Sequence, residues 1–281
     1  MRYLLVPGAG GAAWYWSRVV PLLESAGHDA IAVDLPGDDE SAGPAEYADI
    51  VAAAAAGSQD VVLVAQSMGG FTAPLVCERI CVRELVLVNA MIPTPGETAG
   101  QWWGHVDSAA AQREAAAAGG YGEFDLATYF LHDVPPDVAA EGEPYQRPEA
   151  DIGFAQPCAF TAWPNVLIRV LVGTDDRFFP ASFQRRVAQQ RLGIQTDMLP
   201  GGHLLALANP TGVADYLLSN DLSMPAGSRT PANQPRPHHP PGRLPLPTGS
   251  PPTELTGGAD TSTENGNTSR STIGDRSAIP L

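Results

Sequence analysis

The chain has 281 residues and a formal net charge of −15, so its surface is poorly suited to a nucleic-acid partner. All sixteen basic residues are arginine, and the lack of lysine excludes Schiff-base chemistry, pyridoxal phosphate attachment and a phosphate-binding loop lysine. The three cysteines, Cys77, Cys81 and Cys158, lack the spacing of a zinc site, so no metal is expected and we interpret them as small buried hydrophobes.

The N-terminal part is predicted to form a strand, residues 2–6, a glycine-rich loop, residues 7–13, and a helix. This loop approximates a dinucleotide-binding fingerprint, with Ala13 at the third glycine position and Asp34 at about the right distance. The bulky Trp14 lies where a phosphate-facing helix should start, which favours the alternative of a backbone loop placed beside a reactive side chain. No cofactor is therefore expected.

The central stretch of the chain combines a buried strand, a sharp turn and a helix. Val61–Val64 is a continuous apolar run, as in a strand covered on both faces, and an amphipathic helix follows to Ile80. Between them, residues 65–69 (Ala-Gln-Ser-Met-Gly) fit the small-x-Ser-x-Gly pattern of a nucleophile elbow. Such a turn projects the Ser67 hydroxyl above the sheet edge, beside the N-terminus of the helix.

Around this stretch, strand-like and helical segments alternate, and every connection is long enough for a crossover. The pattern predicts a mostly parallel, doubly wound α/β sheet of about six strands covered on both sides. The other strands are expected at residues 30–33, 84–88, 166–172 and 195–199, and the other helices at residues 44–56, 181–191 and 210–219.

The alternation breaks between about residues 90 and 164, where proline, glycine and aromatic residues are frequent. We interpret this segment as a helical cap inserted over the carboxyl edge of the sheet, with helices near 108–118 and 136–142; a structural subdomain without a site is the alternative. His105 and His132 in this segment are expected to be surface or packing histidines.

The C-terminal part, residues 224–281, is dominated by proline, serine, threonine and glycine and has no aromatic residue. Such a composition cannot bury enough apolar surface to offset the entropy of ordering, so it predicts a disordered tail after a domain of residues 1–223. The first apolar run is too short for a signal peptide, and no stretch could span a membrane. We expect a cytoplasmic protein with no membrane partner, and the sequence leaves its oligomeric state open.

Three candidate reactive residues follow predicted parallel strands: Ser67, Asp175 or Asp176, and His203. The carboxyl ends of such strands form the edge at which open α/β sheets bind ligands. Serine is a weak nucleophile that needs a histidine to take its proton, and a carboxylate must hold the tautomer of that histidine. The order serine, acid, histidine is that of α/β hydrolases.

Five motifs in this order resemble the α/β-hydrolase fold, and more narrowly its branch of plant hydroxynitrile lyases and methyl esterases. They are the glycine-rich loop with Trp14, the serine elbow, Asn89-Ala90-Met91-Ile92-Pro93, Asp176 followed by Phe183-Gln184, and Gly202-His203. The resemblance implies that Asp176 is the acid and that the backbone N–H groups of Ala9 and Met68 form an oxyanion hole. Pro7-Gly8 departs from the His-Gly usual at this position.

The resemblance implies a cofactor-independent serine hydrolase whose partner is a small molecule, most simply a small apolar ester. Aromatic residues suggest an apolar pocket that includes Trp14, Trp102, Trp103 and Leu204. The lyases of this branch carry a lysine directly after the catalytic histidine, and Leu204 in its place favours hydrolysis. Lyase-type carbonyl chemistry and a binding protein without turnover remain the alternatives.

Overall fold

The structure is a computed structural model that describes residues 1–219. The predicted tail, residues 224–281, and the predicted domain end at Ser223 lie outside these described residues.

The predicted parallel sheet is confirmed: six strands lie in the order β2-β1-β3-β4-β5-β6, and every neighbouring pair is parallel. Their bounds are β1 Arg2–Val6, β2 Asp29–Ala32, β3 Val61–Gln66, β4 Glu84–Val88, β5 Leu167–Gly173 and β6 Asp197–Leu199. All residues of β3 and β4 are buried, as continuous apolar runs in a doubly covered sheet should be. β3 is two residues longer than the predicted run, whereas β6 is shorter than expected because only three residues pair with β5.

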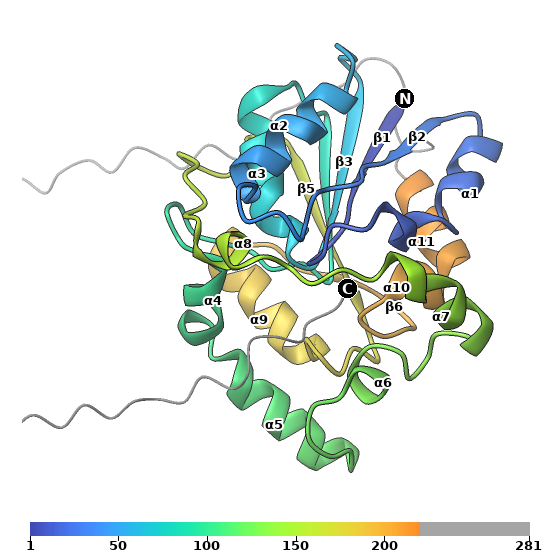
Figure 1. The fold of residues 1–281 in the computed structure, drawn as a ribbon, viewed down its shortest axis with the longest axis vertical. Coiled ribbons are helices and arrows are strands. Elements are labelled where there is room, and N and C mark those ends of the chain that lie inside the picture. The colour runs from blue at the N-terminus through green and yellow to red at the C-terminus, as the bar shows by residue number, and fades with distance from the viewer. Residues whose placement is uncertain (220–281) are drawn as a thin grey trace, which may run out of the picture. The chain divides into compact units, whose positions relative to one another are not determined.

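Helices cover both faces of this sheet (Figure 1). α2 and α3 pack together beside one face, whereas α1 and α11 lie on the other. The bounds of the helices that belong to this layer are η1 Ala13–Trp16, α1 Val20–Ser25, α2 Pro44–Ala54, α3 Gly69–Arg79, α9 Ala181–Leu192, α10 Leu205–Ala208 and α11 Pro210–Leu218.

Between β4 and β5 the chain forms short helices beyond the carboxyl ends of the strands, drawn in green and yellow-green in Figure 1. They are α4 Ala99–His105, α5 Ser108–Gly119, α6 Leu126–Tyr129, α7 Pro136–Gly142, η2 Glu143–Tyr145 and α8 Asp151–Ala155. The expected helices near 108–118 and 136–142 correspond to α5 and α7. The sequence analysis missed α4, although Thr98 and Gln101 form a capping box, with reciprocal side chain to backbone hydrogen bonds of 3.1 Å.

The helix α4 is fixed to α9, one of the helices that cover the sheet, by a buried ion pair. Glu97, just before α4, pairs with Arg191 at the end of α9, and Arg191 also donates to the carbonyl of Ile92 at 2.9 Å. Glu97 also contacts His105 Nδ1 at 2.6 Å, so that histidine has a partner at the surface, as expected. The hydrogen bonds from Arg191 help to hold the pKa of Glu97 below its ordinary value despite partial burial.

The cysteines differ from the expectation in part. Cys158 is buried, Cys77 is half-buried and Cys81 is exposed. Burial raises the pKa of Cys77 and of Cys158 to about 12, so both stay protonated thiols at neutral pH.

Candidate active site

Ser67 lies on a strained turn between β3 and α3. Its backbone φ is 50°, a left-handed value that serine rarely adopts outside functional turns. Small residues are required around the turn: a Cβ added to Gly69 would lie 2.5 Å from the carbonyl oxygen of Pro7. The start of α3 and the loop after β1 approach each other so closely that the glycine of the elbow pattern has a direct steric cause.

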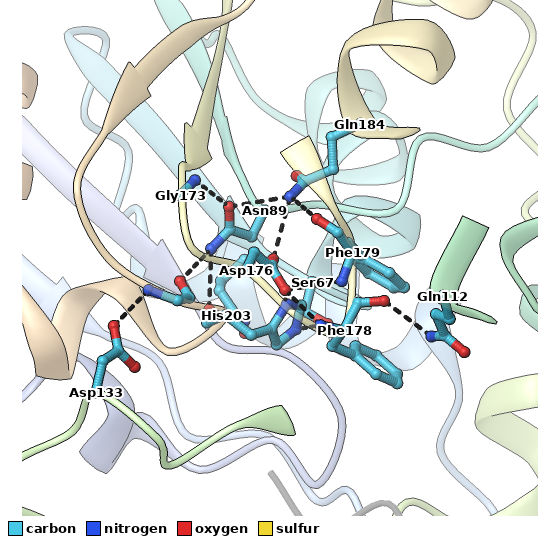
Figure 2. A network of polar contacts seen from close by, with 12 residues as sticks. Ser67, Asn89, Gln112, Asp133, Gly173, Asp176, Phe178, Phe179, Gln184 and His203 are labelled. Carbon is cyan, nitrogen blue, oxygen red and sulfur yellow. Dashed lines mark hydrogen bonds and ion pairs between the residues drawn. The ribbon is translucent and has the colours of Figure 1, made fainter. Parts of the chain in front are cut away.

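His203 and Asp176 continue from Ser67 as one hydrogen-bonded chain (Figure 2). Ser67 Oγ lies 3.0 Å from His203 Nε2, and His203 Nδ1 lies 2.9 Å from Asp176 Oδ2. Because a carboxylate only accepts, Nδ1 carries the proton and Nε2 accepts from the serine hydroxyl. His203 is fully buried, and Ser67 is 9% exposed, so the chain opens toward solvent only at the serine.

Asp176, and not Asp175, is the acid that contacts the histidine. Asp176 Oδ1 accepts from the backbone N–H groups of Phe178 and Phe179 at 2.8 and 2.7 Å, which orients the carboxylate. The exposed Asp175 instead accepts from the N–H of Gly201 at 3.0 Å. The two neighbouring acids therefore have different structural tasks.

Asn89, which directly follows β4, links the loop that carries Asp176 to the loop that carries His203. Its side-chain amide donates to the carbonyls of Gly202 and His203, both at 3.0 Å, and its oxygen accepts from the N–H of Gly173 at 2.8 Å. Gln184 donates to Asn89 Oδ1 and to Asp176 Oδ2 at 3.3 and 3.1 Å (Figure 2). The sequence analysis had Asn89 only as part of a motif; a polar residue at the carboxyl end of a buried strand was the available signal.

The glycine-rich loop after β1 places backbone beside Ser67. Gly11 N–H donates to the carbonyl of Gly8 at 3.1 Å, and Gly10 has a φ of 78°, which defines a tight turn with Ala9 and Gly10 at its centre. A Cβ on Gly8 would lie 2.9 Å from Ser67 Cβ. Within residues 1–219, neither the Ala9 nor the Met68 N–H donates to another protein group, so both donors are available to a ligand.

The glycines of this loop have a structural cause inside the protein. A Cβ on Gly10 or Gly11 would collide with the backbone carbonyl of Arg147 or Leu35, so the glycines are required by contacts inside the protein. Asp34, the candidate ribose-binding residue, accepts from the N–H of Ala13 at 3.0 Å and pairs with Arg147 at 2.9 Å. These contacts account for the apparent fingerprint.

Three phenyl rings, of Phe130, Phe178 and Phe179, enclose the imidazole of His203, each with its centroid 5.0 Å away. The Phe178-Phe179 pair was not predicted from the sequence as part of the site, although it follows Asp176 by only two residues. These rings separate the histidine from water, which strengthens its hydrogen bonds.

The four predicted pocket residues lie at different depths. Trp102 is fully buried and donates to the carbonyl of Ile92, and both Trp102 and Trp103 pack on Phe179, one layer away from the histidine. Leu204 is buried directly after His203. Trp14 stacks on Tyr145 at 5.8 Å instead of facing the histidine rings.

Two hollows lie near the site. A small one of about 10 Å³ is lined by residues of the serine elbow, the glycine-rich loop and Glu149. A wide depression of about 660 Å³ lies on the outer side of the acid loop, beside His132, Asp133 and Arg177. Across residues 1–219 no cluster of side chains could hold a metal ion, and no helix has the length and apolarity to cross a bilayer.

Comparison with known proteins agrees with this architecture. A sequence model described as the alpha/beta hydrolase family matches residues 3–216. The chain belongs to this family. The esterase PIR7B of Oryza sativa subsp. japonica is 39% identical over 112 residues, which are 35% of this chain and 42% of that protein. The alpha-hydroxynitrile lyase of Arabidopsis thaliana is 27% identical over 140 residues, 46% of this chain and 51% of that protein.

A solved structure shares the fold. The crystal structure of polyneuridine aldehyde esterase superposes with a TM-score of 0.63 at 21% identity, over 78% of this chain and 98% of that chain. The sequence match to the polyneuridine aldehyde esterase of Rauvolfia serpentina is 33% over 109 residues, 34% of this chain and 41% of that protein. The chain thus spans less than half the length of these two esterases in sequence. The predicted resemblance to a branch of esterases and lyases is confirmed.

Proposed function

We propose that the protein is a cofactor-independent serine esterase that cleaves a small apolar carboxylic ester through an acyl-enzyme. The observation that carries this proposal is the continuous chain from Ser67 Oγ through His203 to Asp176, with both links at 3.0 Å or less. The esterases among its relatives support the same chemistry.

In the first half-reaction, Ser67 Oγ attacks the ester carbonyl while its proton passes to His203 Nε2. Asp176 stabilises the resulting imidazolium, and the free N–H groups of Ala9 and Met68 donate to the oxyanion. The bond between the carbonyl carbon and the alkoxy oxygen then breaks, and the imidazolium gives its proton to the departing alcohol.

In the second half-reaction, a water molecule attacks the acyl-enzyme and gives its proton to His203 Nε2. The carbonyl carbon gains an oxygen from water, the Ser67 Oγ bond breaks, and the proton returns to the serine. The products are a carboxylic acid and a regenerated hydroxyl. The buried rings around His203 suit an apolar acyl or alkoxy group.

Lyase chemistry is the alternative, since one relative is a hydroxynitrile lyase. A lyase of this kind must stabilise a leaving anion such as cyanide, which a cation beside the histidine does well. Here the following residue is the buried Leu204, and the nearby Arg177 donates to the carbonyl of Thr128 while its guanidinium lies over the ring of Tyr121. Both observations favour hydrolysis.

The test combines a fluorophosphonate probe with nitrophenyl esters of rising chain length and mandelonitrile. We expect stoichiometric labelling by intact mass and hydrolysis of short esters, both lost in Ser67→Ala and kept in Ser25→Ala, a serine on α1 far along the chain from the elbow. A protein with neither labelling nor turnover would support the binding protein, and Ser67-dependent cyanide release would support the lyase. Ester hydrolysis that persists in Ser67→Ala would contradict the assignment.

A further inference from the structure

A short segment just before α8, residues 147–150, forms hydrogen bonds with Gly10 of the glycine-rich loop. Arg147 Nε donates to the carbonyl of Gly10 at 3.1 Å, and Glu149 Oε2 accepts from the N–H of the same residue at 2.7 Å. One residue further on, Ala150 N–H donates to the carbonyl of Gly37 at 2.6 Å. Both backbone groups of Gly10, the residue next to Ala9, are thus held by side chains from more than 130 positions away in the chain.

Glu149 is itself fixed and faces the site. Its Oε1 accepts from the hydroxyl of the buried Tyr47 on α2 at 2.9 Å. It lines the small hollow together with Gly8, Met68 and Gly69, which belong to the two segments that would surround an oxyanion. No residue of the proposed triad bonds to this carboxylate in the part of the chain that the structure describes, so the proposed reaction leaves it without a role.

We propose that Glu149 is a positioning residue for ester cleavage, whose ionised carboxylate fixes the turn that presents the Ala9 N–H to the developing oxyanion. This inference rests on the proposed esterase function. A tight turn can flip its central peptide, here the one between Ala9 and Gly10, and the flip would turn the Gly10 N–H away from Glu149. The Ala9 N–H belongs to the preceding peptide, between Gly8 and Ala9. By holding the Gly10 N–H, Glu149 selects one orientation of the peptide after Ala9 and so restricts the backbone torsions of Ala9, on which the direction of its own N–H depends.

The strength of this contact depends on the charge of the carboxylate. A hydrogen bond to an ionised acceptor is roughly twice as strong as a neutral one. Burial raises the pKa of Glu149 to about 7, against the opposing effects of the Gly10 N–H, the Tyr47 hydroxyl and the charge of Arg147. The contact is therefore strongest above neutral pH and weakens as the carboxyl gains a proton.

Other charged groups lie around Glu149. Arg147 faces it from the same segment and is paired with Asp34. Asp38 and Asp39 act on Tyr47 from the loop after β2, and hydrogen bonds from Ser41 hold the pKa of Asp39 below its ordinary value. Glu149 is the group whose pKa is raised to about 7, so its carboxyl changes charge near neutral pH.

The kinetic test uses Glu149→Gln, which keeps size and one acceptor but cannot ionise, and Glu149→Ala. At pH 8.5 or so we expect kcat for a nitrophenyl ester to fall by about tenfold in Glu149→Gln, with KM little changed, because the lost contact matters in the transition state. Glu149→Ala should lose more. The profile of kcat against pH should contain an inflection near pH 7 in the wild type that is absent from Glu149→Gln.

The matched control is Glu46→Gln, which removes a carboxylate that also accepts from a backbone N–H, that of Gly43 at 2.9 Å, away from the loop. Its kcat and pH profile should equal those of the wild type. An unchanged kcat in Glu149→Gln across pH 6 to 9, or an equal loss in Glu46→Gln, would overturn the inference.

An NMR measurement on the full chain separates this inference from the esterase proposal. With glycine labelled by ¹⁵N in the Ser67→Ala background, the Gly10 amide should titrate with a midpoint near the pKa of Glu149, about 7, and should not titrate after Glu149→Gln. A Gly10 amide that does not titrate overturns the role of Glu149. A titrating amide in a protein whose wild type cleaves no ester overturns the esterase proposal instead.

Discussion

The half-buried carboxyl of Glu149 should make the protein less stable as pH rises, and Glu149→Gln should remove this dependence. Burial raises the pKa from 4.5 in the unfolded chain to about 7 in the folded protein, so the native state binds the proton more tightly. Its stabilising contribution is then fully present below pH 4.5 and is lost as pH rises to about 7. Since one pH unit corresponds to about 1.36 kcal/mol, the loss amounts to about 3 kcal/mol.

Urea unfolding followed by tryptophan fluorescence, at half-unit steps from pH 4.5 to 8.5, measures this effect. The quantity to compare is the difference in unfolding free energy between wild type and Glu149→Gln at each pH. Other titrating groups cancel in that difference, and the pH-independent cost of the amide only displaces it. We expect the variant to gain about 3 kcal/mol on the wild type across the range.

The control again is Glu46→Gln. The contribution of Glu46 to the free energy of unfolding should change with pH in the opposite direction to that of Glu149. Hydrogen bonds from Gln156 and from the Gly43 N–H lower the pKa of Glu46, so its contribution to stability is present above its unfolded pKa and is lost as pH falls. The reasoning would be refuted if the difference in unfolding free energy between Glu149→Gln and the wild type stayed constant from pH 4.5 to 8.5.

Two further predictions concern the groups that orient His203. Asp176→Asn should lower kcat by about 10⁴-fold because an amide cannot hold the proton on Nδ1, whereas Asp175→Asn should stay within a few-fold of wild type; similar small losses in both would contradict the assignment. Asn89→Ala and Asn89→Gly should both lower kcat, because each releases the carbonyl of His203. The φ of 45° at this position strains alanine but not glycine, so thermal unfolding should show Asn89→Ala to be the less stable variant. Equal melting temperatures of the two variants would argue against that strain.

The sheet and the three residues of the proposed triad were predictable because each is specified locally. An apolar run rich in β-branched residues such as Val61–Val64 is typical of a covered strand, and the small residues around Ser67 follow from a steric requirement at one turn. The rule that parallel strands end at one edge of the sheet predicted His203 and either Asp175 or Asp176, and the family resemblance implied Asp176. The strand and the turn are specified within a few residues, so the sequence carries them directly.

The surroundings of the site depend on contacts between distant segments, and those were missed. Nothing near Glu149 in the sequence indicates that its carboxylate meets Gly10, because the contact spans 139 positions. The predicted pocket residues Trp102 and Trp103 lie behind Phe179 for the same reason: the path of the inserted helices decides which ring reaches the histidine. Composition could indicate an aromatic site but could not order its layers.

The strand order explains why Asn89 is needed between the reactive residues. Ser67 follows β3 and Asp176 follows β5, and these strands are not neighbours, because β4 lies between them. The hydrogen-bonded chain from the serine to its acid must therefore cross the end of β4, and Asn89 is the residue that directly follows that strand. Its left-handed backbone and its hydrogen bonds to Gly202, His203 and Gly173 link the loops after β5 and β6 above the gap. A parallel sheet thus brings the three side chains to one edge, but the geometry between them depends on the strand that contributes no reactive group.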